Sequence, residues 1–367
     1  MATAKYIEDF RDGPRARALA DALLGEMEGT SGTCRFMEVC GTHTMAAFRF
    51  GIRSLLPANL KLLSGPGCPV CVTPTSYIDT ALECARGEKV IVATFGDMLR
   101  VPGTESSLVL ERARGADVRV MYSPMDALEL AGREPESRVV FLGVGFETTA
   151  PAVAAAVVEA RRRGLGNFFV HCAHKLIPPA MRAIVESGEV SLDGFLCPAH
   201  VSAIIGADAY RFLAQEHSLS CVVAGFETLD MLAGILMLVR QRKRGEASVE
   251  NAYSRVVRPE GNRAALSLLE EVFEPGDAEW RGLGKIPGSG LHLSEKYRAF
   301  DAAEEFELEA APSQEPQGCL CGEILRGVAE PPDCPLFDKT CTPENPIGAC
   351  MVSSEGTCAA FYRYAER

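Results

Sequence analysis

Six of the fourteen cysteines of this 367-residue chain lie between Cys319 and Cys358, and this cluster limits most strongly how the chain can fold. The surrounding segment, residues 318–348, contains nine prolines and glycines. Because such a segment can hardly fold on a hydrophobic core alone, a bound metal is expected to tie it together. The cysteines are Cys319, Cys321, Cys334, Cys341, Cys350 and Cys358.

The spacing of these cysteines favours an iron–sulfur cluster over zinc. The last four are separated by six, eight and seven residues, without the two tight C-x-x-C knuckles that are typical of zinc ribbons. Iron–sulfur clusters accept wider spacing, with four thiolates around a cubane. We therefore predict a [4Fe-4S] cluster, with zinc and free or disulfide-bonded thiols as alternatives. The favoured ligands are Cys334, Cys341, Cys350 and Cys358, with Cys319 and Cys321 as substitutes or as an adjacent redox pair.

Charge and hydropathy argue against several classes of protein. The formal net charge is −12, whereas a nucleic-acid-binding surface needs a basic stripe. No uncharged apolar run reaches the length of about 18 residues that a membrane span needs. Residues 1–13 carry charges of both signs and no apolar stretch, unlike a secretory signal. We expect a cytoplasmic protein, whose fourteen reduced cysteines indicate metal or redox chemistry rather than a disulfide framework.

Alternating apolar runs and helical stretches indicate an α/β protein. Helical stretches lie between short buried strands, as in βαβ units around parallel sheets. An amphipathic helix is predicted over residues 16–29, and strands over residues 35–40, 89–95, 118–122 and 139–144. We predict two similar α/β domains with parallel sheets and a small C-terminal iron–sulfur domain, preceded by a proline-broken, acidic connector. The expected divisions are residues 1–130, 131–257 and 258–367.

One short sequence occurs twice, each time between an apolar strand and a helix. Gly145-Phe146-Glu147-Thr148 follows residues 139–144, and Gly225-Phe226-Glu227-Thr228 follows residues 221–224. Both helices end in cations followed by glycine, which suits the helix dipole and the C-cap. The layout indicates related α/β units, although four identical residues also arise by chance. Glu147 and Glu227 are expected at the sheet edge that faces a ligand crevice, as cofactor-binding residues, or else as helix-capping carboxylates.

Cys40 begins the motif Cys40-Gly41-Thr42-His43 at the end of a predicted strand. Because a helical stretch over residues 44–56 follows, the thiol is expected at a helix N-terminus, with a depressed pKa and some thiolate at neutral pH. His43 could orient or protonate this thiol, or add an imidazole ligand. The alternatives are a buried cysteine and a capping or core histidine.

Cys68 and Cys71 form a C-x-x-C pair within a loop of glycines and prolines, residues 64–74. Such a pair closes a small disulfide or supplies two metal ligands. Since the chain contains only one pair of this kind, a complete zinc site would need partners from elsewhere. The pair is interpreted as redox-active, with two-ligand metal binding and a structural role as alternatives.

The remaining cysteines and histidines give weaker signals. His171, His174 and Lys175, and likewise His200, could line a crevice, but structural roles are favoured. Five cysteines, mostly with apolar neighbours, are expected as small buried hydrophobes. They are Cys34, Cys84, Cys172, Cys197 and Cys221.

Four motifs follow one another along the chain: Cys40-Gly41-Thr42-His43, Gly65-Pro66-Gly67-Cys68-Pro69-Val70-Cys71-Val72-Thr73-Pro74, Gly145-Phe146-Glu147-Thr148-Thr149-Ala150-Pro151 and Gly348-Ala349-Cys350-Met351-Val352-Ser353-Ser354-Glu355-Gly356-Thr357-Cys358. Together they resemble the HypD family of hydrogenase maturation proteins. The second and fourth motifs are specific by themselves, and the order of all four is very specific. The resemblance extends from about residue 34 to residue 365.

The resemblance implies a scaffold for assembly of the Fe(CN)2CO group of [NiFe] hydrogenases, rather than an enzyme of ordinary turnover. It implies a complex with a small HypC-type chaperone and transient delivery of cyanide by HypE. Carried over, Cys40 would bind iron together with a cysteine of the chaperone, and His43 would lie beside that iron. Cys68 and Cys71 would be a redox pair that takes electrons from a [4Fe-4S] cluster. The competing interpretations are a cluster-dependent disulfide reductase, for which Cys40 would be dispensable, and a structural zinc protein.

Overall fold

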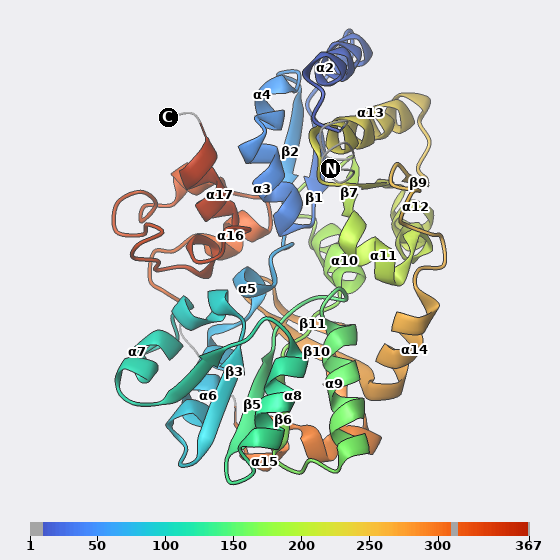
Figure 1. Cartoon of the computed structure of the whole chain (residues 1–367). Helices are drawn as coiled ribbons and strands as arrows, with labels where there is room; N and C mark the ends of the chain where they lie inside the picture. The colour runs from blue at the N-terminus through green and yellow to red at the C-terminus, as the bar shows by residue number, and fades with distance from the viewer. Residues whose placement is uncertain (1–9, 310–314, 366–367) are drawn as a thin grey trace.

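Two parallel β-sheets form the main body of the molecule, one above the other in Figure 1. The computed structural model describes residues 10–309 and 315–365. Sheet A, in the upper part of the view, has five strands, and sheet B, in the lower part, has four. The C-terminal segment lies at one side, on the left in Figure 1. The predicted α/β class with parallel sheets is confirmed.

All neighbouring strands within these two sheets are parallel. Sheet A runs in the spatial order β2 (Leu60–Ser64), β1 (Cys34–Glu38), β7 (Gly194–Pro198), β8 (Ser220–Ala224) and β9 (Val249–Asn251). Sheet B runs β4 (Asp117–Val120), β3 (Val90–Thr94), β5 (Arg138–Gly143) and β6 (Phe168–Cys172). The four strands predicted before residue 145 are confirmed as β1, β3, β4 and β5.

The two sheets share one strand order. In each, the second strand along the chain lies at an edge, followed in space by the first, third and fourth, and sheet A adds a fifth. The likeness of the two sheets agrees with two similar α/β domains. The chain builds β1 and β2, then all of sheet B, and then returns to complete sheet A. Strands on both sides of residue 130 therefore share a sheet, and the division of the chain into domains stays a prediction.

Helices connect the strands and cover the sheets. In chain order they are α2 (Gly13–Met27), α3 (Gly41–Arg49), α4 (Ile52–Leu55), α5 (Pro69–Val72), α6 (Thr75–Arg86), α7 (Leu108–Ala113), α8 (Pro124–Arg133), α9 (Ala150–Arg163), α10 (Ile177–Ser187), α11 (Ala199–Ile205), α12 (Arg211–His217), α13 (Thr228–Arg244), α14 (Arg263–Val272), α15 (Ala302–Glu305), α16 (Cys321–Leu325) and α17 (Thr357–Tyr364). Short 3-10 helices are η1 (Gly96–Arg100), η2 (Ala207–Tyr210), η3 (Glu295–Phe300), η4 (Pro331–Asp333) and η5 (Ala349–Met351). Among the described residues, no helix has the length and apolar character that crossing a bilayer requires.

Two expectations about helices meet different outcomes. The helix predicted over residues 16–29 is confirmed as α2. The stretch predicted over residues 44–56 begins earlier, directly after Cys40, and is two helices rather than one. It breaks at Gly51, whose φ of 62° lies in the left-handed region that glycine adopts without strain.

Residues 258–293 are more regular than expected. They contain α14 and an antiparallel hairpin of β10 (Phe273–Trp280) and β11 (Gly284–Leu293). The prolines in this segment do not prevent pairing, because both strands of a two-stranded hairpin are edge strands. The buried Trp280 stacks near Phe146, with ring centroids 6.0 Å apart, so the hairpin packs at the carboxyl end of sheet B.

The repeated sequence follows β5 and β8, and each copy leads into a helix as predicted. These helices, α9 and α13, end at Gly164 and Gly245, whose φ angles of 68° and 67° belong to a left-handed C-cap. However, β5 is the third strand of sheet B, whereas β8 is the fourth strand of sheet A. The two copies therefore do not occupy corresponding places in the two sheets.

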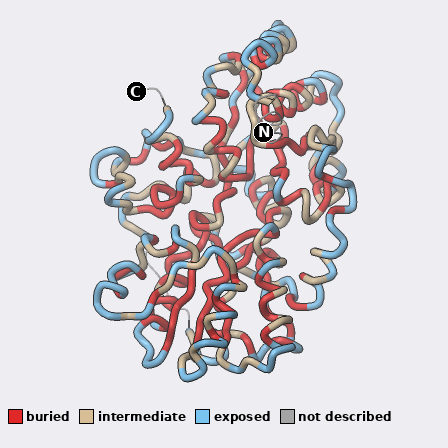
Figure 2. The backbone as a smooth tube through the Cα atoms, in the orientation of Figure 1, coloured by how far each residue is buried: buried red, intermediate tan, exposed pale blue. Residues whose placement is uncertain are grey.

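The inner strands are buried along their length, as the red tube of the sheets in Figure 2 shows. Parallel sheets covered on both faces have continuous apolar strands, which explains the runs seen in the sequence. One apolar cluster continues from α6 through Cys68 and Cys71 to the C-terminal cysteines. Residues 1–9, expected to lack a secretory signal, and residues 310–314 of the acidic connector lie outside the described part of the chain.

Candidate thiol and metal-binding site

Cys40 follows β1 and is the N-cap residue of α3, with an extended backbone. Strands β1 and β7 are the pair at which the strand order of sheet A reverses, and ligands bind at such switch points in open α/β sheets. Burial raises the pKa of the Cys40 thiol to about 12, and the carboxylate of Glu355 adds to the rise. The prediction of a thiolate at neutral pH is therefore wrong here, because burial raises the pKa of Cys40 by more than the helix N-terminus lowers it. A bound metal would reverse this, since a coordinating thiol is deprotonated.

The backbone of Cys40 is held by the end of β1 and by the loop before α5. Its N–H donates to Oε2 of the buried Glu38 over 3.1 Å, and the N–H of Gly41 donates to the carbonyl of Gly67 over 2.8 Å. A Cβ on Gly67 would lie only 2.0 Å from the nitrogen of Cys40. Only glycine at residue 67 therefore allows residues 65–73, here called the dithiol loop, to lie against Cys40.

Glu355 was not predicted as a site residue, yet it packs against the start of α3. Its carboxylate accepts a hydrogen bond from the hydroxyl of Thr42 over 2.7 Å. Its Cβ occupies the space where Gly41 would carry a side chain. The only sequence signal for this residue was its place inside the tail motif that ends at Cys358. The C-terminal tail thus closes over the turn that begins at Cys40.

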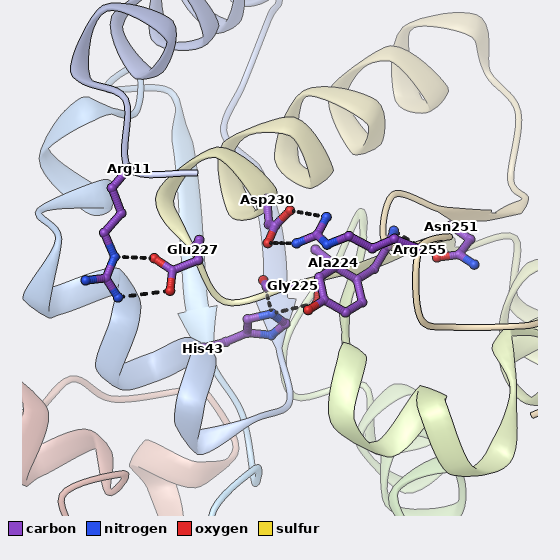
Figure 3. Close-up of polar contacts among 9 residues, drawn as sticks. Arg11, His43, Ala224, Gly225, Glu227, Asp230, Asn251 and Arg255 are labelled. Carbon is purple, nitrogen blue, oxygen red and sulfur yellow. Dashed lines mark hydrogen bonds and ion pairs between the residues drawn. The ribbon is translucent and has the colours of Figure 1, made fainter. Parts of the chain in front are cut away.

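His43 is buried at the carboxyl end of β8, as Figure 3 shows. Its Nε2 lies 3.1 Å from the carbonyl oxygen of Ala224 and 2.9 Å from that of Gly225, so Nε2 carries the proton and donates. Burial lowers the pKa of His43 to about 4, which keeps the ring neutral. Nδ1 has no hydrogen-bond partner among the described residues, so its lone pair is the one left to bind a metal.

The two repeated glutamates lie in different surroundings. Glu227 pairs with Arg11 at 2.5 and 2.9 Å and is turned away from His43 (Figure 3). Glu147 is buried, and its Oε1 accepts a hydrogen bond from the N–H of Ile177, the first residue of α10. Burial raises the pKa of Glu147 to about 7, and its Oε2 has no partner in the described part of the chain. Glu147 thus caps a neighbouring helix, and a cofactor-binding role for either residue stays a prediction.

The dithiol loop joins Cys40 to the C-terminal cysteines. Cys68 is the N-cap residue of α5, and its sulfur accepts from the N–H of Cys71 over 3.4 Å. The Cys71 thiol points to the carbonyl of Ala349 over 3.9 Å. Burial raises the pKa of Cys71 well above its usual value, while contact with the neighbouring Cys350 lowers it. One loop therefore touches the backbone of Cys40 at one end and the C-terminal cysteines at the other.

All six C-terminal cysteines line one cavity. The sulfurs of Cys321 and Cys350 lie 2.7 Å apart, and the N–H of Ile347 donates to the sulfur of Cys341 over 3.3 Å. Gly348 leaves room for Cys319, whose sulfur would lie 2.6 Å from a Cβ at that position. The cavity is lined by Cys319, Cys321, Ile324, Cys334, Phe337, Cys341, Gly348, Cys350, Met351 and Cys358.

This donor set fits a cluster better than a single ion. Within residues 10–309 and 315–365, no three histidine, cysteine, aspartate or glutamate side chains are arranged to hold one metal ion. A cubane is bound by thiolates, and hydrogen bonds to its sulfurs set its reduction potential. An apolar cavity surrounded by sulfurs, with a backbone N–H aimed at one of them, suits such a cluster. The choice of four ligands among six stays a prediction.

The weaker candidates occupy structural positions. His171 stacks on Tyr77 and lies 2.8 Å from the hydroxyl of Thr80, and His174 lies 3.2 Å from the sulfur of Cys172. Lys175 is buried near the ring of Trp280, His200 is exposed beside Phe226, and Cys172 is half-buried. The other four cysteines expected in the core are buried: Cys34, Cys84, Cys197 and Cys221.

The chain is similar to known proteins over nearly its whole length. The hydrogenase maturation factor HypD of Azotobacter vinelandii is 49% identical over 370 residues, which cover 99% of this chain and 97% of that protein. HypD of Cupriavidus necator is 48% identical over 98% of this chain and 97% of its own length, and HypD of Escherichia coli is 46% identical over 99% of both. A family model described as "HypD: Hydrogenase formation hypA family" matches residues 15–365, and the chain therefore belongs to the HypD family.

Proposed function

We propose that this protein is a cytoplasmic scaffold on which the Fe(CN)2CO group of [NiFe] hydrogenases is assembled, in complex with a small HypC-type chaperone. Its relatives are named hydrogenase maturation factors, which supports a part in forming that enzyme. HypE would bind transiently to deliver cyanide. The observation that carries the proposal is the dithiol loop, because Gly67 lies against Cys40 and Cys71 lies against Ala349.

Cys40 would hold the iron cargo together with a cysteine of the chaperone. Thiolate is a soft, strongly donating ligand, which suits low-spin iron that carries cyanide and carbon monoxide. Glu38 holds the backbone N–H of Cys40, and His43 fixes the first turn of α3 through its Nε2 hydrogen bonds. These contacts would keep the iron-binding thiol in place, and the Nδ1 of His43 would be available beside the iron.

Cys68 and Cys71 would be the redox pair, cycling between a disulfide and two thiols with uptake of two electrons and two protons. The C-terminal cavity fits a [4Fe-4S] cluster, which when bound would supply single electrons. The thiol of Cys71 points to the carbonyl of Ala349, the residue before Cys350, so the dithiol lies beside this cavity and would receive them there. The favoured ligands are Cys334, Cys341, Cys350 and Cys358.

Replacement of Cys40 tests the scaffold directly. Anaerobic co-purification of the Cys40→Ala variant with the chaperone should give a complex without the cyanide and carbon monoxide bands in its infrared spectrum. Hydrogenase maturation should be lost. Cys84→Ala is the matched control, because Cys84 is a buried thiol in α6 outside the site. Normal maturation with Cys40→Ala would contradict the scaffold.

The contact between Cys71 and Cys350 also favours a second function, a cluster-dependent disulfide reductase. This function predicts that Cys68→Ala and Cys71→Ala abolish activity, whereas Cys40→Ala has no effect. Iron and sulfide analysis of anaerobically purified protein distinguishes both functions from a structural zinc protein. Colourless protein with stoichiometric zinc would contradict the proposed cluster.

A further inference from the structure

Arg281 is a buried cation without a role in the function above, at a junction of three segments. It follows Trp280, the last residue of β10, and only 1% of its side chain is exposed. Its backbone N–H donates to the carbonyl of Val72 over 2.9 Å, and its Nε donates to the carbonyl of Thr73 over 2.9 Å. Both acceptors directly follow Cys71, so Arg281 holds the end of the helix that carries the dithiol.

The turn after Arg281 packs against the first C-terminal cysteines. Gly282 has a φ of 78°, and a Cβ there would lie 2.2 Å from the Cα of Gly322, which follows Cys321. Because Gly282 follows Arg281 and Gly322 follows Cys321, Arg281 lies beside the place where the C-terminal segment enters the cavity.

The guanidinium is only partly satisfied by its neighbours. Nη1 donates to Oε2 of Glu315 over 2.5 Å, but that side chain is 47% exposed, so water screens its charge. Nη2 is buried and has no hydrogen-bond partner among the described residues. An unpaired buried donor is costly, and anionic sulfur is an acceptor that a charged donor binds strongly.

We propose that Arg281 is a positioning residue of the redox centre, which ties the dithiol loop to the C-terminal cysteines and donates from Nη2 to anionic sulfur at Cys319 or Cys321. The charge part rests on the proposed function, since it requires a cluster or thiolates in the cavity. A fixed cation in a region of low dielectric stabilises the more negative, reduced state of such a centre. The tie keeps Cys71 covered and next to Cys350.

Three variants separate the two roles of Arg281. One role is the tie, meaning the hydrogen bonds to the carbonyls of Val72 and Thr73, and the other is the positive charge. Arg281→Lys keeps the charge but lacks the fork that reaches both Thr73 and Glu315. Arg281→Gln removes the charge and the fork. Arg326→Gln is the matched control, because Arg326 hydrogen-bonds the same turn through the carbonyl of Gly282 but its side chain is 26% exposed.

The tie is measured on reduced, metal-free, full-length protein by the rate at which iodoacetamide labels Cys71, read by peptide mass spectrometry. Both Arg281 variants should label Cys71 roughly tenfold faster than the wild type, because opening of the loop is easier. Cys84 in the same molecule should label at its original rate. Unchanged labelling of Cys71, the same increase in Arg326→Gln, or an equal increase at Cys84 in both variants would overturn the tie.

The charge is measured as the reduction potential of protein reconstituted with iron and sulfide. Arg281→Gln should shift the equilibrium about tenfold toward the oxidised state, which is about 59 mV for a one-electron couple. Arg281→Lys should keep the wild-type potential. An unchanged potential in Arg281→Gln would overturn the charge role. If the wild type takes up neither iron nor sulfide, the proposed cluster and the charge role both fail, while the labelling of Cys71 still decides the tie.

Discussion

Gly67 has no room for a side chain, because the backbone of Cys40 fills the space where its Cβ would lie. Its N–H donates to the carbonyl of Gly65 over 2.8 Å, which makes residues 65–67 a tight turn. The N–H of Gly65 in turn donates to the carbonyl of Glu38 at the end of β1. A single methyl group at residue 67 would therefore move the candidate iron ligand.

We expect Gly67→Ala to lower the free energy of unfolding by about 3 kcal/mol, because the new methyl group collides with rigid backbone. Iron binding at Cys40 should weaken as well. Denaturant unfolding and iron analysis measure the two effects. Gly25→Ala is the control, since Gly25 lies in α2 with open space around it. This variant should raise the free energy of unfolding by up to about 1 kcal/mol. A Gly67→Ala protein as stable as the wild type would show that this contact is not tight.

His171 shows how burial alone sets the charge of a residue. Burial lowers its pKa to about 4, whereas an unfolded histidine has a pKa of about 6.5. Between these pH values the unfolded chain binds a proton at His171 that the folded protein does not. The contribution of neutral His171 to the stability of the folded protein is therefore fully present above about pH 6.5 and is lost as the pH falls toward 4.

Between pH 7 and pH 5, the free energy of unfolding of the wild type should fall by about 2 kcal/mol more than that of His171→Gln. Urea unfolding of both proteins at the two pH values measures this difference. The other buried titratable groups are present in both proteins and cancel in the comparison. They include Glu38, His43, Glu147 and His174. Parallel losses in the two proteins would mean that His171 is protonated in the folded state.

Helix α3 is held by two segments that are remote in the sequence. The end of β8 and the residue after it accept the hydrogen bonds of His43, and the C-terminal tail accepts that of Thr42 through Glu355. Because Cys40 is the N-cap residue of this helix, both contacts fix the direction in which its thiol points. The position of the thiol thus depends on the packing of the whole helix.

A double-mutant cycle of Thr42→Ala and Glu355→Ala should give a coupling free energy of about 1 kcal/mol. The reason is that a hydroxyl donates directly to a half-buried carboxylate over 2.7 Å. Urea unfolding of the four proteins measures the coupling. Glu355→Gln keeps an acceptor for Thr42 and should lose less stability than Glu355→Ala. Additive effects of the two alanine substitutions would exclude the contact.

The C-terminal segment links both sheets into one molecule. Arg100, which follows sheet B strand β3, donates to the carbonyls of Pro343 and Val352 over 3.0 and 3.2 Å. Gly327 lies against β1, because a Cβ added at this residue would lie 2.8 Å from the methyl carbon of Met37. A metal that orders this segment would therefore stabilise contacts with both sheets.

We expect removal of metal by a chelator to lower the unfolding temperature of the whole protein, because a ligand that binds only the folded state stabilises it. Scanning calorimetry of anaerobic protein before and after chelation measures the shift. Cys350→Ala should abolish the shift, whereas Cys84→Ala, outside the cavity, should retain it. If Cys350→Ala retained the shift in unfolding temperature, Cys350 would not be a metal ligand.

Much of the fold could be predicted because its signals are local. The runs that became β3 and β5 carry their own apolar pattern, and Gly164 and Gly245 end their helices after clusters of cations. The hairpin β10/β11 is not predicted, because prolines in a sequence indicate breaks and both of its strands contain one. Strand order also escaped prediction, since nothing in β1 indicates that β7 will lie beside it.

The sequence by itself determined that the apolar runs at β1, β3, β4, β5 and β8 become strands, that Cys40 follows one of them and that six cysteines share one small segment. Those features depend on near neighbours along the chain. Tertiary structure alone decided that Glu355 packs against the start of α3, that His43 is neutral and that Arg281 meets the dithiol loop. Burial and long-range contacts set these properties, because a charge or hydrogen bond depends on what surrounds it in space. The C-terminal cysteines could be found in the sequence, but their contact with Cys71 required the folded chain.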